Sequence, residues 1–438
     1  MIDVGHMLSV AKDAGVPALD GWLAEAVGLT LEAEGLRASI GDLYELRPSG
    51  RPPVQAEVVG VRGTRTLLMP LGVTQGLEVG SPVRRMTGSA RVEVGPELLG
   101  RVVDGLGTPI DGGPALRLDA ERPLHGRPPS PLLRAPISEC LPTGVRAIDG
   151  LLSFARGQRI GIFAGGGVGK STLLGMLVRR MRADVAVIAL IGERGREVQE
   201  FVHQTLGPEG MQRTVVVVAT GAEPPLVRAR GALYATAVAE HFRDQGLSVL
   251  FLMDSVTRYA MALREIGLAV GEPPASKGYT PSVFAALPQL LERAGNATGK
   301  GSITGIYTVL VEGDDLSDPI ADAARAILDG HIVLSRRLAE RGHFPAIDVP
   351  QSISRCMSSV VSSERMGLAQ HARETLASFS EAEDLLAIGA YRAGSVPRLD
   401  EALKFMPALE KFLRQPFEED ADPSTVDAVL RQIWAGRK

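Results

Sequence analysis

The chain has 438 residues, of which 45% are hydrophobic and 22% charged, and its formal net charge is −4. This length predicts two or three domains of an ordinary globular protein, and the slightly acidic balance argues against broad binding to nucleic acid or to an anionic membrane. The two cysteines, Cys140 and Cys356, exclude a disulfide framework and a cysteine-based zinc site.

The N-terminus and the hydropathy pattern indicate a cytosolic protein. The first residues lack the basic segment and following apolar run that a secretory signal requires. No uninterrupted apolar stretch reaches the ~18 residues needed to cross a bilayer.

The first third of the chain has β character. Residues 1–20 are mixed in composition and are interpreted as an N-terminal arm. From about residue 21 to residue 86, short β-type runs alternate with Gly and Pro, and Arg-Gly at 62–63 predicts a hairpin turn. We therefore expect a small β-barrel or sandwich. The turn-rich residues 100–114 and the proline-rich residues 123–136 indicate an extended connector.

Strands and helices alternate in the middle of the chain. Apolar runs at 185–191, 214–219, 249–253 and 303–311 are separated by helical stretches such as 225–242. Unbroken apolar strands predict a parallel sheet that is covered on both faces, and hence an α/β fold. From about Ser362 helix formers take over, and a final helix is expected near 425–434.

Residues 164–172 read Ala-Gly-Gly-Gly-Val-Gly-Lys-Ser-Thr and follow an apolar run with strand character. A strand, a glycine loop and Lys-Ser at a helix start form a phosphate-binding loop, because backbone N–H groups and the helix N-terminus face the phosphates. Lys170 would reach the β and γ phosphates, and the Ser171 hydroxyl would ligate Mg²⁺. An ordinary glycine-rich turn is the alternative. The predicted nucleotide-binding residues of this loop are Gly165, Gly166, Gly167, Val168, Gly169, Lys170, Ser171 and Thr172.

Acidic residues follow three of the predicted strands: Glu193, Asp254 and the Glu-Gly-Asp-Asp run at 312–315. Ligands of such folds lie beyond the carboxyl ends of the strands. Asp254 is therefore the predicted second residue of the Mg²⁺ site, and Glu193 the candidate base that aligns an attacking water. Their ordinary alternatives are a helix-capping aspartate and a surface turn.

Four segments together resemble the rotary-type hexameric ATPases: residues 191–198, 253–259, 311–315 and 345–355. Residues 271–284 and 328–337 are most similar to the ATPases of flagellar and type III protein export. The resemblance covers roughly residues 20–415. It implies a RecA-like P-loop core with an N-terminal β-barrel and a C-terminal helical domain. After the arm at 1–20, we place the barrel at residues 21–90, the RecA-like core at 91–360 and the helical domain at 361–438.

The same resemblance implies roles for further residues. Glu193 would be the catalytic carboxylate, and Arg194 and Arg258 would lie near the γ-phosphate. Phe344 would pack on adenine, and Arg355 would reach the neighbouring subunit's site as an arginine finger. A guanidinium suits that role because its planar fork complements the charge that develops on the γ-phosphoryl oxygens. Lys277, in a Gly/Pro-rich loop, would face the channel of the ring and is a candidate contact to a stalk; a solvated loop lysine is the alternative.

The resemblance also implies ATP and Mg²⁺ as cofactors, a homohexamer, stator-like and central-stalk partners, and exported substrates with their chaperones. No nucleic acid is expected, and the membrane is reached only through partners, so that the protein would lie in the cytoplasm at the export gate of the inner membrane. The alternatives are a catalytic subunit of a rotary ATP synthase, an RNA-translocating RecA-type ring and a non-hydrolysing regulatory subunit. The first is disfavoured because the acidic motif at 380–386 is too sparse, the second because residues 21–86 lack an interleaved aromatic-basic pattern, and the third because Glu193 is present.

Two departures from the family pattern bear on the site. Ala164 replaces the first glycine of the phosphate loop, and Pro350 lies inside the segment that carries Arg355. Since a proline fixes φ and removes a donor, we expect Pro350 to influence how Arg355 is presented.

Overall fold

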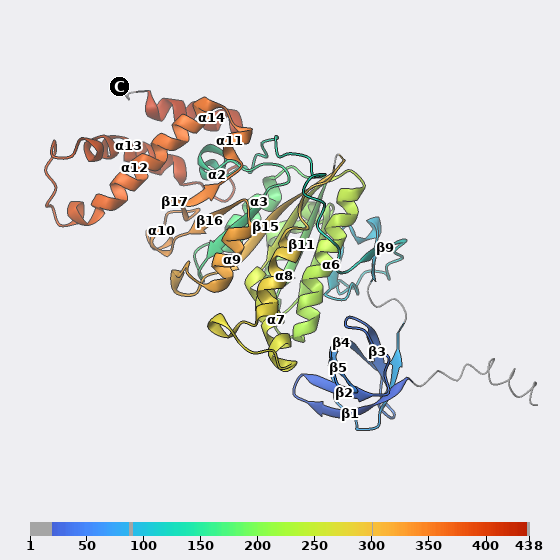
Figure 1. The fold of residues 1–438 in the computed structure, drawn as a ribbon. Helices are drawn as coiled ribbons and strands as arrows, with labels where there is room; N and C mark the ends of the chain where they lie inside the picture. Colours follow the sequence, from blue (N-terminus) through green and yellow to red (C-terminus); the bar gives the residue numbers. More distant parts are fainter. Residues whose placement is uncertain (1–19, 87–90, 300, 436–438) are drawn as a thin grey trace, which may run out of the picture.

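The computed structural model describes residues 20–86, 91–299 and 301–435. It consists of an N-terminal barrel, a central α/β layer structure and a C-terminal group of helices, which follow one another along the chain (Figure 1). The predicted arm at 1–20 lies almost wholly outside the described residues. No helix within the described ranges is long and apolar enough to cross a membrane.

The N-terminal part is a closed six-stranded barrel with the strand order β1-β2-β5-β4-β3-β6. The strands are β1 (Gly21–Val27), β2 (Thr30–Glu34), β3 (Leu43–Leu46), β4 (Val54–Arg62), β5 (Arg65–Pro70) and β6 (Pro82–Arg85). Alternate residues such as Leu23, Tyr44 and Leu68 fill its interior. The structure thus decides for a barrel and against a sandwich.

The predicted turn at 62–63 was placed one residue too early. Arg62 still pairs with Arg65 across the β4–β5 ladder, so that Gly63 and Thr64 form the turn. The reason is twofold: Gly63 takes the positive φ of 61° that the turn needs, and a register shift between Val58 and Gly60 lengthens β4 by one residue.

A nine-stranded sheet forms the centre, in the order β17-β16-β10-β15-β13-β11-β12-β8, with β14 paired to β15. The strands are β8 (Val102–Asp104), β10 (Arg159–Ala164), β11 (Val185–Ile191), β12 (Thr214–Ala219), β13 (Ser248–Asp254), β14 (Gly295–Asn296), β15 (Ser302–Leu310), β16 (Gly330–Leu334) and β17 (Ile347–Ser354). All ladders are parallel except those of β14 and β17. The expected parallel sheet is confirmed, and the predicted strands match within one residue.

The connector between barrel and sheet contains a two-stranded ribbon, β7 (Arg91–Val94) with β9 (Ala120–Pro123), and the short helix η1 (Pro96–Leu98). The predicted turns at 100–114 and connector at 123–136 leave out both strands except Pro123, and the ribbon was not predicted. Its strands are only four residues long, which is too short for a clear alternation of apolar and polar residues.

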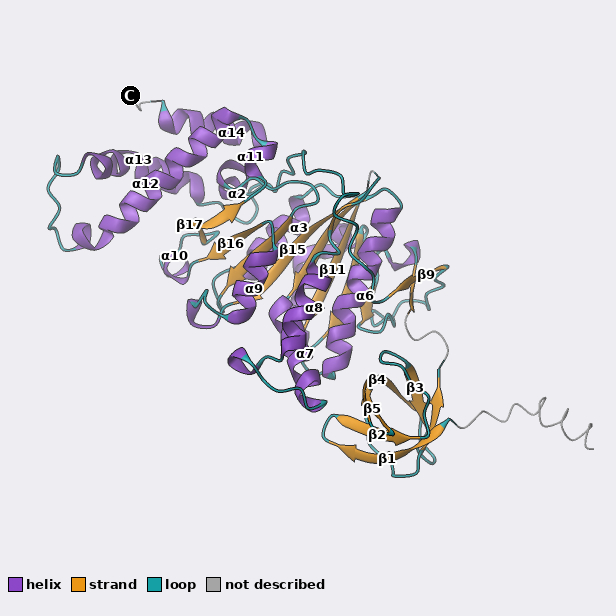
Figure 2. Cartoon of the chain, in the orientation of Figure 1, coloured by secondary structure: helices purple, strands orange, loops and turns teal. Residues whose placement is uncertain are grey.

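Helices cover both faces of the sheet (Figure 2). One core cluster joins α3 to strand residues such as Ile162 and Ile188, and the other joins the α6–α8 layer to residues such as Phe163 and Val187. The helices of this part are α2 (Arg146–Leu151), α3 (Lys170–Arg180), α4 (Gly195–Glu200), η2 (Phe201–Leu206), α5 (Gly207–Met211), α6 (Pro225–Asp244), α7 (Val256–Ala269), η3 (Ser276–Gly278), α8 (Pro281–Leu291), η4 (Glu312–Asp314), α9 (Pro319–Ile327) and α10 (Arg336–Glu340). Residues on alternate sides of the strands therefore belong to separate cores.

The C-terminal part is helical, as expected: α11 (Met357–Val360), α12 (Ser363–Ala387), α13 (Pro397–Leu413) and α14 (Pro423–Trp434). It packs against α2, where Gly150 leaves room for Phe412 and Leu430. Gln415 accepts a hydrogen bond from the backbone of Arg146 and donates one to the carbonyl of Gly144. These contacts tie the helices to the start of the central part, close to the phosphate-loop helix.

Candidate nucleotide site

The loop between β10 and α3 has the backbone that a phosphate-binding loop requires. Gly167 and Gly169 have φ values of 77° and 90°, which other residues rarely adopt, and Lys170 starts α3 directly after them. The N-terminal N–H groups of α3 therefore face the space beyond β10, where an anion is favoured. Ala164 is the last residue of β10 and does not have a positive φ, so the missing first glycine is accommodated inside the strand.

The predicted loop residues do not all face that space. Gly166, Gly167, Ser171 and Thr172 are exposed, whereas the Val168 side chain is buried in the core. Val168 can therefore contribute only its backbone to a ligand. The prediction named it because a sequence motif does not separate main-chain from side-chain roles.

Three charged groups meet at the carboxyl ends of the central strands. Lys170 Nζ lies 2.5 Å from Oδ1 of Asp254 and 3.7 Å from Oε1 of Glu193. Asp254 ends β13 and Glu193 follows β11, and the parallel β11–β13 ladder places these ends side by side. The structure thus brings together the three residues on which the nucleotide hypothesis depends.

Thr308 is part of the same cluster and was not predicted. Its hydroxyl donates to Asp254 Oδ1 at 2.6 Å from the buried middle of β15. The carboxylate of Asp254 is therefore held from two sides, by Thr308 and by Lys170. A threonine within an apolar strand carries no signal of its own, and only the strand order reveals its neighbour.

The pKa of Glu193 is raised to about 8, first because the carboxyl is buried, then because it shares a hydrogen bond with Glu197 and lies near Asp254; Lys170 opposes the shift. The pKa of Glu197 is lowered by the same hydrogen bond. Such separated values are a feature of proton-transferring carboxylates. Glu197, four residues after Glu193 on α4, was also missed by the sequence analysis.

These groups line a cavity of about 1290 Å³. It reaches from the phosphate loop past Arg194 and Arg258 to Lys277 and Phe417. The side chain of Arg258 packs on Gly192, whose φ is 73°, and its buried Nε has no hydrogen-bond partner among the described residues. A buried guanidinium nitrogen without a partner favours an anionic ligand here.

The residues present fit a magnesium ion held largely by its ligand. Within the described residues no group of three His, Cys, Asp or Glu side chains could hold a metal on its own. Mg²⁺ commonly keeps its waters and takes one or two protein ligands in addition to substrate phosphates. The Ser171 hydroxyl, exposed at the start of α3, and the Asp254 carboxylate would supply those ligands.

Two aromatic side chains flank α3. The Phe344 ring is 44% exposed and lies where a Cβ on Gly169 would meet it at 3.4 Å. Phe417 contacts Gly175, six residues further along, and the Arg179 guanidinium lies 5.1 Å from the centre of the Phe417 ring. The backbone N–H of Gln415 donates to the carbonyl of Phe344, so the two segments are joined. Phe417, in the tail that the sequence analysis could not place, was missed.

Arg355 does not join this cluster. It directly follows β17, and the antiparallel β16–β17 ladder pairs Gly330 with Ser354. Since β16 is parallel to β10, Arg355 lies at the amino-end edge of the sheet, opposite the phosphate loop. Pro350 sits on the edge strand β17 next to the register shift of that ladder, and so does not interrupt a hydrogen-bonded centre of the sheet.

Lys277 has partners that the sequence analysis did not foresee. It has a φ of 49°, and its Nζ lies 3.3 Å from Asp318 and 3.5 Å from Asp315. These ion pairs join the loop after α7 to the acidic loop after β15, and Lys277 and Asp318 both line the cavity. Lys277 is thus an exposed lysine with acidic partners, and its contact to a stalk stays a prediction.

Comparison with known proteins agrees with this geometry. Residues 144–354 match the ATP synthase alpha/beta family, nucleotide-binding domain; residues 24–87 match the β-barrel domain of that family, and residues 361–432 match the T3SS EscN ATPase C-terminal domain. The last match distinguishes the chain from rotary ATP synthase subunits and from RNA-translocating rings, which were two of the three alternative hypotheses.

Individual relatives extend over nearly the whole chain. The flagellum-specific ATP synthase of Pseudomonas aeruginosa is 52% identical over 96% of this chain and 94% of its own length. The type 3 secretion system ATPase of Sinorhizobium fredii is 48% identical over 96% of this chain and 93% of its own length.

Solved structures agree. The assembled ATPase EscN of the enteropathogenic E. coli type III secretion system has a TM-score of 0.90 at 45% identity, covering 94% of this chain and 99% of EscN. EscN in complex with its central stalk EscO has a TM-score of 0.86 at the same identity and coverage. A phosphate loop, a lysine set between two acidic strand ends and these relatives lead to one conclusion: the chain is an ATPase of the ATP synthase alpha/beta family and belongs to its flagellum-specific and type III secretion branch.

Proposed function

We propose that this protein hydrolyses Mg-ATP as a homohexameric ring and so energises protein export through a flagellar or type III secretion apparatus. The observation that carries the proposal is the position of Lys170, between Asp254 and Glu193 at the open end of a glycine loop. A triphosphate in this cavity would take over the ammonium group, because its charge exceeds that of either carboxylate.

Each side chain then has a task. The loop N–H groups and Lys170 bind the β and γ phosphates, and Ser171 and Asp254 hold the magnesium ion, which supplies positive charge to the phosphate oxygens when bound. Glu193 aligns a water and accepts its proton, a role that its raised pKa suits near neutral pH. Arg194 and Arg258, which line the cavity, complete the positive surroundings of the γ-phosphate.

The two aromatic side chains complete the nucleotide site. Phe344 lies against Gly169 at the start of α3, and Phe417 lies against Gly175 of the same helix and lines the cavity. A planar purine packs well against such rings, since aromatic contacts add about 0.5–1.5 kcal/mol to the burial of the same area. We assign the adenine to this region.

A ring is part of the proposal because one subunit does not contain a complete site. Arg355 lies at the sheet edge opposite its own phosphate loop, so it can act only on a nucleotide of a neighbouring subunit. Arginine fingers contribute about 10³–10⁵ in rate, or roughly 4–7 kcal/mol of barrier. We therefore expect an isolated subunit to be a poor enzyme.

The partners in the proposal are a central stalk, stator-like proteins, and exported substrates with their chaperones, and the expected place is the cytoplasmic side of the inner membrane at the export gate. The structural relative EscN was solved with its central stalk EscO, which supports a stalk for this chain. The exposed loop around Lys277 is a candidate contact.

The substitution Glu193→Gln tests the proposal. We expect the variant to bind ATP as wild type does and to lose at least about a hundredfold in turnover, since the amide cannot accept a proton. Glu209→Gln, an exposed carboxylate on α5 outside the cavity, is the matched control and keeps wild-type turnover. Wild-type turnover in Glu193→Gln would remove Glu193 from the reaction.

A further inference from the structure

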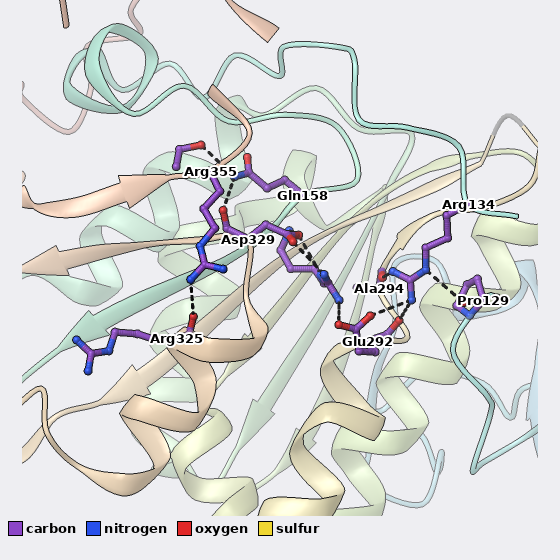
Figure 3. A network of polar contacts seen from close by, with 10 residues as sticks. Pro129, Arg134, Gln158, Glu292, Ala294, Arg325, Asp329 and Arg355 are labelled. Carbon is purple, nitrogen blue, oxygen red and sulfur yellow. Dashed lines mark hydrogen bonds and ion pairs between the residues drawn. The ribbon is translucent and has the colours of Figure 1, made fainter. Parts of the chain in front are cut away.

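We infer that the ion pair between Arg159 and Asp329 positions Arg355 for action on the neighbouring subunit. The inference rests on the proposed function, in which Arg355 acts in trans. It concerns residues at the amino-end edge of the sheet, which the sequence analysis did not connect with catalysis (Figure 3).

The backbone around Arg355 is held at several points by this edge. The backbone N–H of Arg355 donates to the carbonyl of Asp329 at 2.9 Å. Gln158 Nε2 donates to the same carbonyl at 3.3 Å and to the Ser354 hydroxyl at 3.0 Å, and that hydroxyl donates to the carbonyl of Ser153 at 3.0 Å. The segment that carries the guanidinium is therefore anchored at two adjacent residues: at Arg355 by the carbonyl of Asp329, and at Ser354 by Gln158 and Ser153.

Asp329 is in turn fixed by Arg159. Its Oδ2 accepts from the backbone N–H and from Nε of Arg159, both at 3.0 Å, and its Oδ1 accepts from Nη2 at 2.9 Å. Side-chain exposures of 12% and 22% make this a half-buried bidentate pair. Such pairs hold geometry well because two parallel bonds and a planar fork leave little freedom.

Arg159 is further restrained on its other side. Its Nη1 lies 2.5 Å from Oε1 of Glu292, and Arg134 lies 3.2 Å from the other oxygen of Glu292. Since Arg159 is the first residue of β10, the strand that ends in the phosphate loop, this row of charges connects Arg355 to the rigid centre of the sheet.

The side chain of Arg355, by contrast, is nearly free. Within the described residues, its guanidinium makes a single long hydrogen bond, of 3.4 Å from Nη2 to the carbonyl of Arg325 in the last turn of α9. A residue that must reach across an interface to a transition state needs a fixed backbone and a loosely held guanidinium. A displacement of about 1 Å can cost a hundredfold in rate, so the anchoring has a catalytic consequence.

Asp329→Asn tests this inference, with Asp111→Asn as its matched control. Asp111 likewise forms a bidentate pair with an arginine, Arg101, with both bonds at 2.8 Å, and it accepts the backbone N–H of Val102. Its side-chain exposure is similar to that of Asp329. It lies beside β8, the strand at the other side of the sheet from β17. We expect Asp329→Asn to lower kcat about ten- to a hundredfold with an unchanged KM, and Asp111→Asn to leave both near wild type.

Subunit mixing separates positioning from a general structural defect. An Asp329→Asn subunit has an intact own site and a misplaced Arg355, whereas a Glu193→Gln subunit has a dead site and an intact Arg355. In rings mixed one to one, about a quarter of the sites combine an intact Glu193 with an intact neighbouring arginine. Activity should therefore rise above that of either variant alone.

Arg355→Ala mixed with Glu193→Gln is the reference. The positioning role is overturned if this mixture of variants shows complementation and the mixture with Asp329→Asn does not. It is also overturned if Asp329→Asn alone has wild-type kcat. The proposed function stands in both cases. If the Arg355→Ala pair fails to complement, action in trans is itself refuted. Should Asp329→Asn fold poorly, Arg159→Lys keeps the charge, loses the bidentate geometry and is expected to show the same complementation.

Discussion

Lys170 Nζ and Asp254 Oδ1 lie 2.5 Å apart, at the point where a triphosphate would enter. The ammonium group of Lys170 is thus paired with carboxylates. Nucleotide binding would replace this ion pair by a contact of Lys170 with phosphate and of Asp254 with magnesium. Substitution of either residue should therefore affect nucleotide binding.

Lys170→Ala should abolish nucleotide binding. Removing the ammonium leaves Asp254 and Glu193 together without the cation that offsets them, in addition to losing the phosphate contacts. We expect affinity for a fluorescent ATP analogue to fall at least about a hundredfold, or by roughly 2.7 kcal/mol. Equal affinity in the two proteins would contradict the assignment of the phosphate loop.

The pH profile of kcat/KM should report the titration of Glu193. With a pKa raised to about 8, Glu193 is protonated in most molecules at pH 7 and ionises as the pH rises. Its basic form therefore grows about tenfold per pH unit below the pKa, and kcat/KM should rise in parallel.

Glu197→Gln should move that profile to lower pH. Glu197 raises the pKa of Glu193 through a hydrogen bond and a negative charge, and the substitution removes the charge. A profile that remains at the wild-type position would show that Glu197 does not set the pKa. The exposed Glu209→Gln serves again as the control.

The barrel and the α/β part are joined by a buried ion pair between Glu57 of β4 and Arg230 of α6, beside the apolar contacts of Met69 with Leu226 and Val227. Arg230→Ala should lower the free energy of unfolding by about 3–5 kcal/mol, and with it the midpoint of urea unfolding, because the substitution leaves a buried carboxylate unpaired. The double variant Glu57→Leu/Arg230→Met should be close to wild type.

The loss of stability in Arg230→Ala should depend on pH in a defined direction. Burial raises the pKa of Glu57 even with its partner present. A raised carboxyl pKa means that stability is present below the ordinary glutamate pKa and is lost as the pH rises through the folded value. The defect of Arg230→Ala should therefore be smaller near pH 4 than at pH 8; a defect independent of pH would point to lost packing alone.

Alanine substitutions at two glycines of the phosphate loop should differ in their effect on stability. Gly169 has a φ of 90° and lies against Phe344, so Gly169→Ala strains the backbone and should cost about 1–3 kcal/mol in thermal unfolding of the nucleotide-free protein. Gly166 has no positive φ and no atom within 4 Å of an added Cβ, so Gly166→Ala should unfold like wild type. Equal stabilities would contradict the conformation of the loop.

Periodicity and local motifs determined most of the architecture. Unbroken apolar runs located β11 and β12 to the residue, because strands that are buried on both faces need apolar side chains throughout. The glycine loop and the acidic residues at strand ends identified Lys170, Asp254 and Glu193, because the direction of a parallel sheet places all such ends together.

The tertiary structure decided what depends on partners distant in sequence. Strand order placed Thr308 against Asp254, the C-terminal tail placed Phe417 beside α3, and the antiparallel β17 placed Arg355 at the edge away from its own phosphate loop. Asp254 and Thr308 lie 54 residues apart in the sequence, and no local pattern encodes their contact. The physical reason is that a hydrogen bond or a packing contact depends on where chain segments meet, and packing of the whole core determines that.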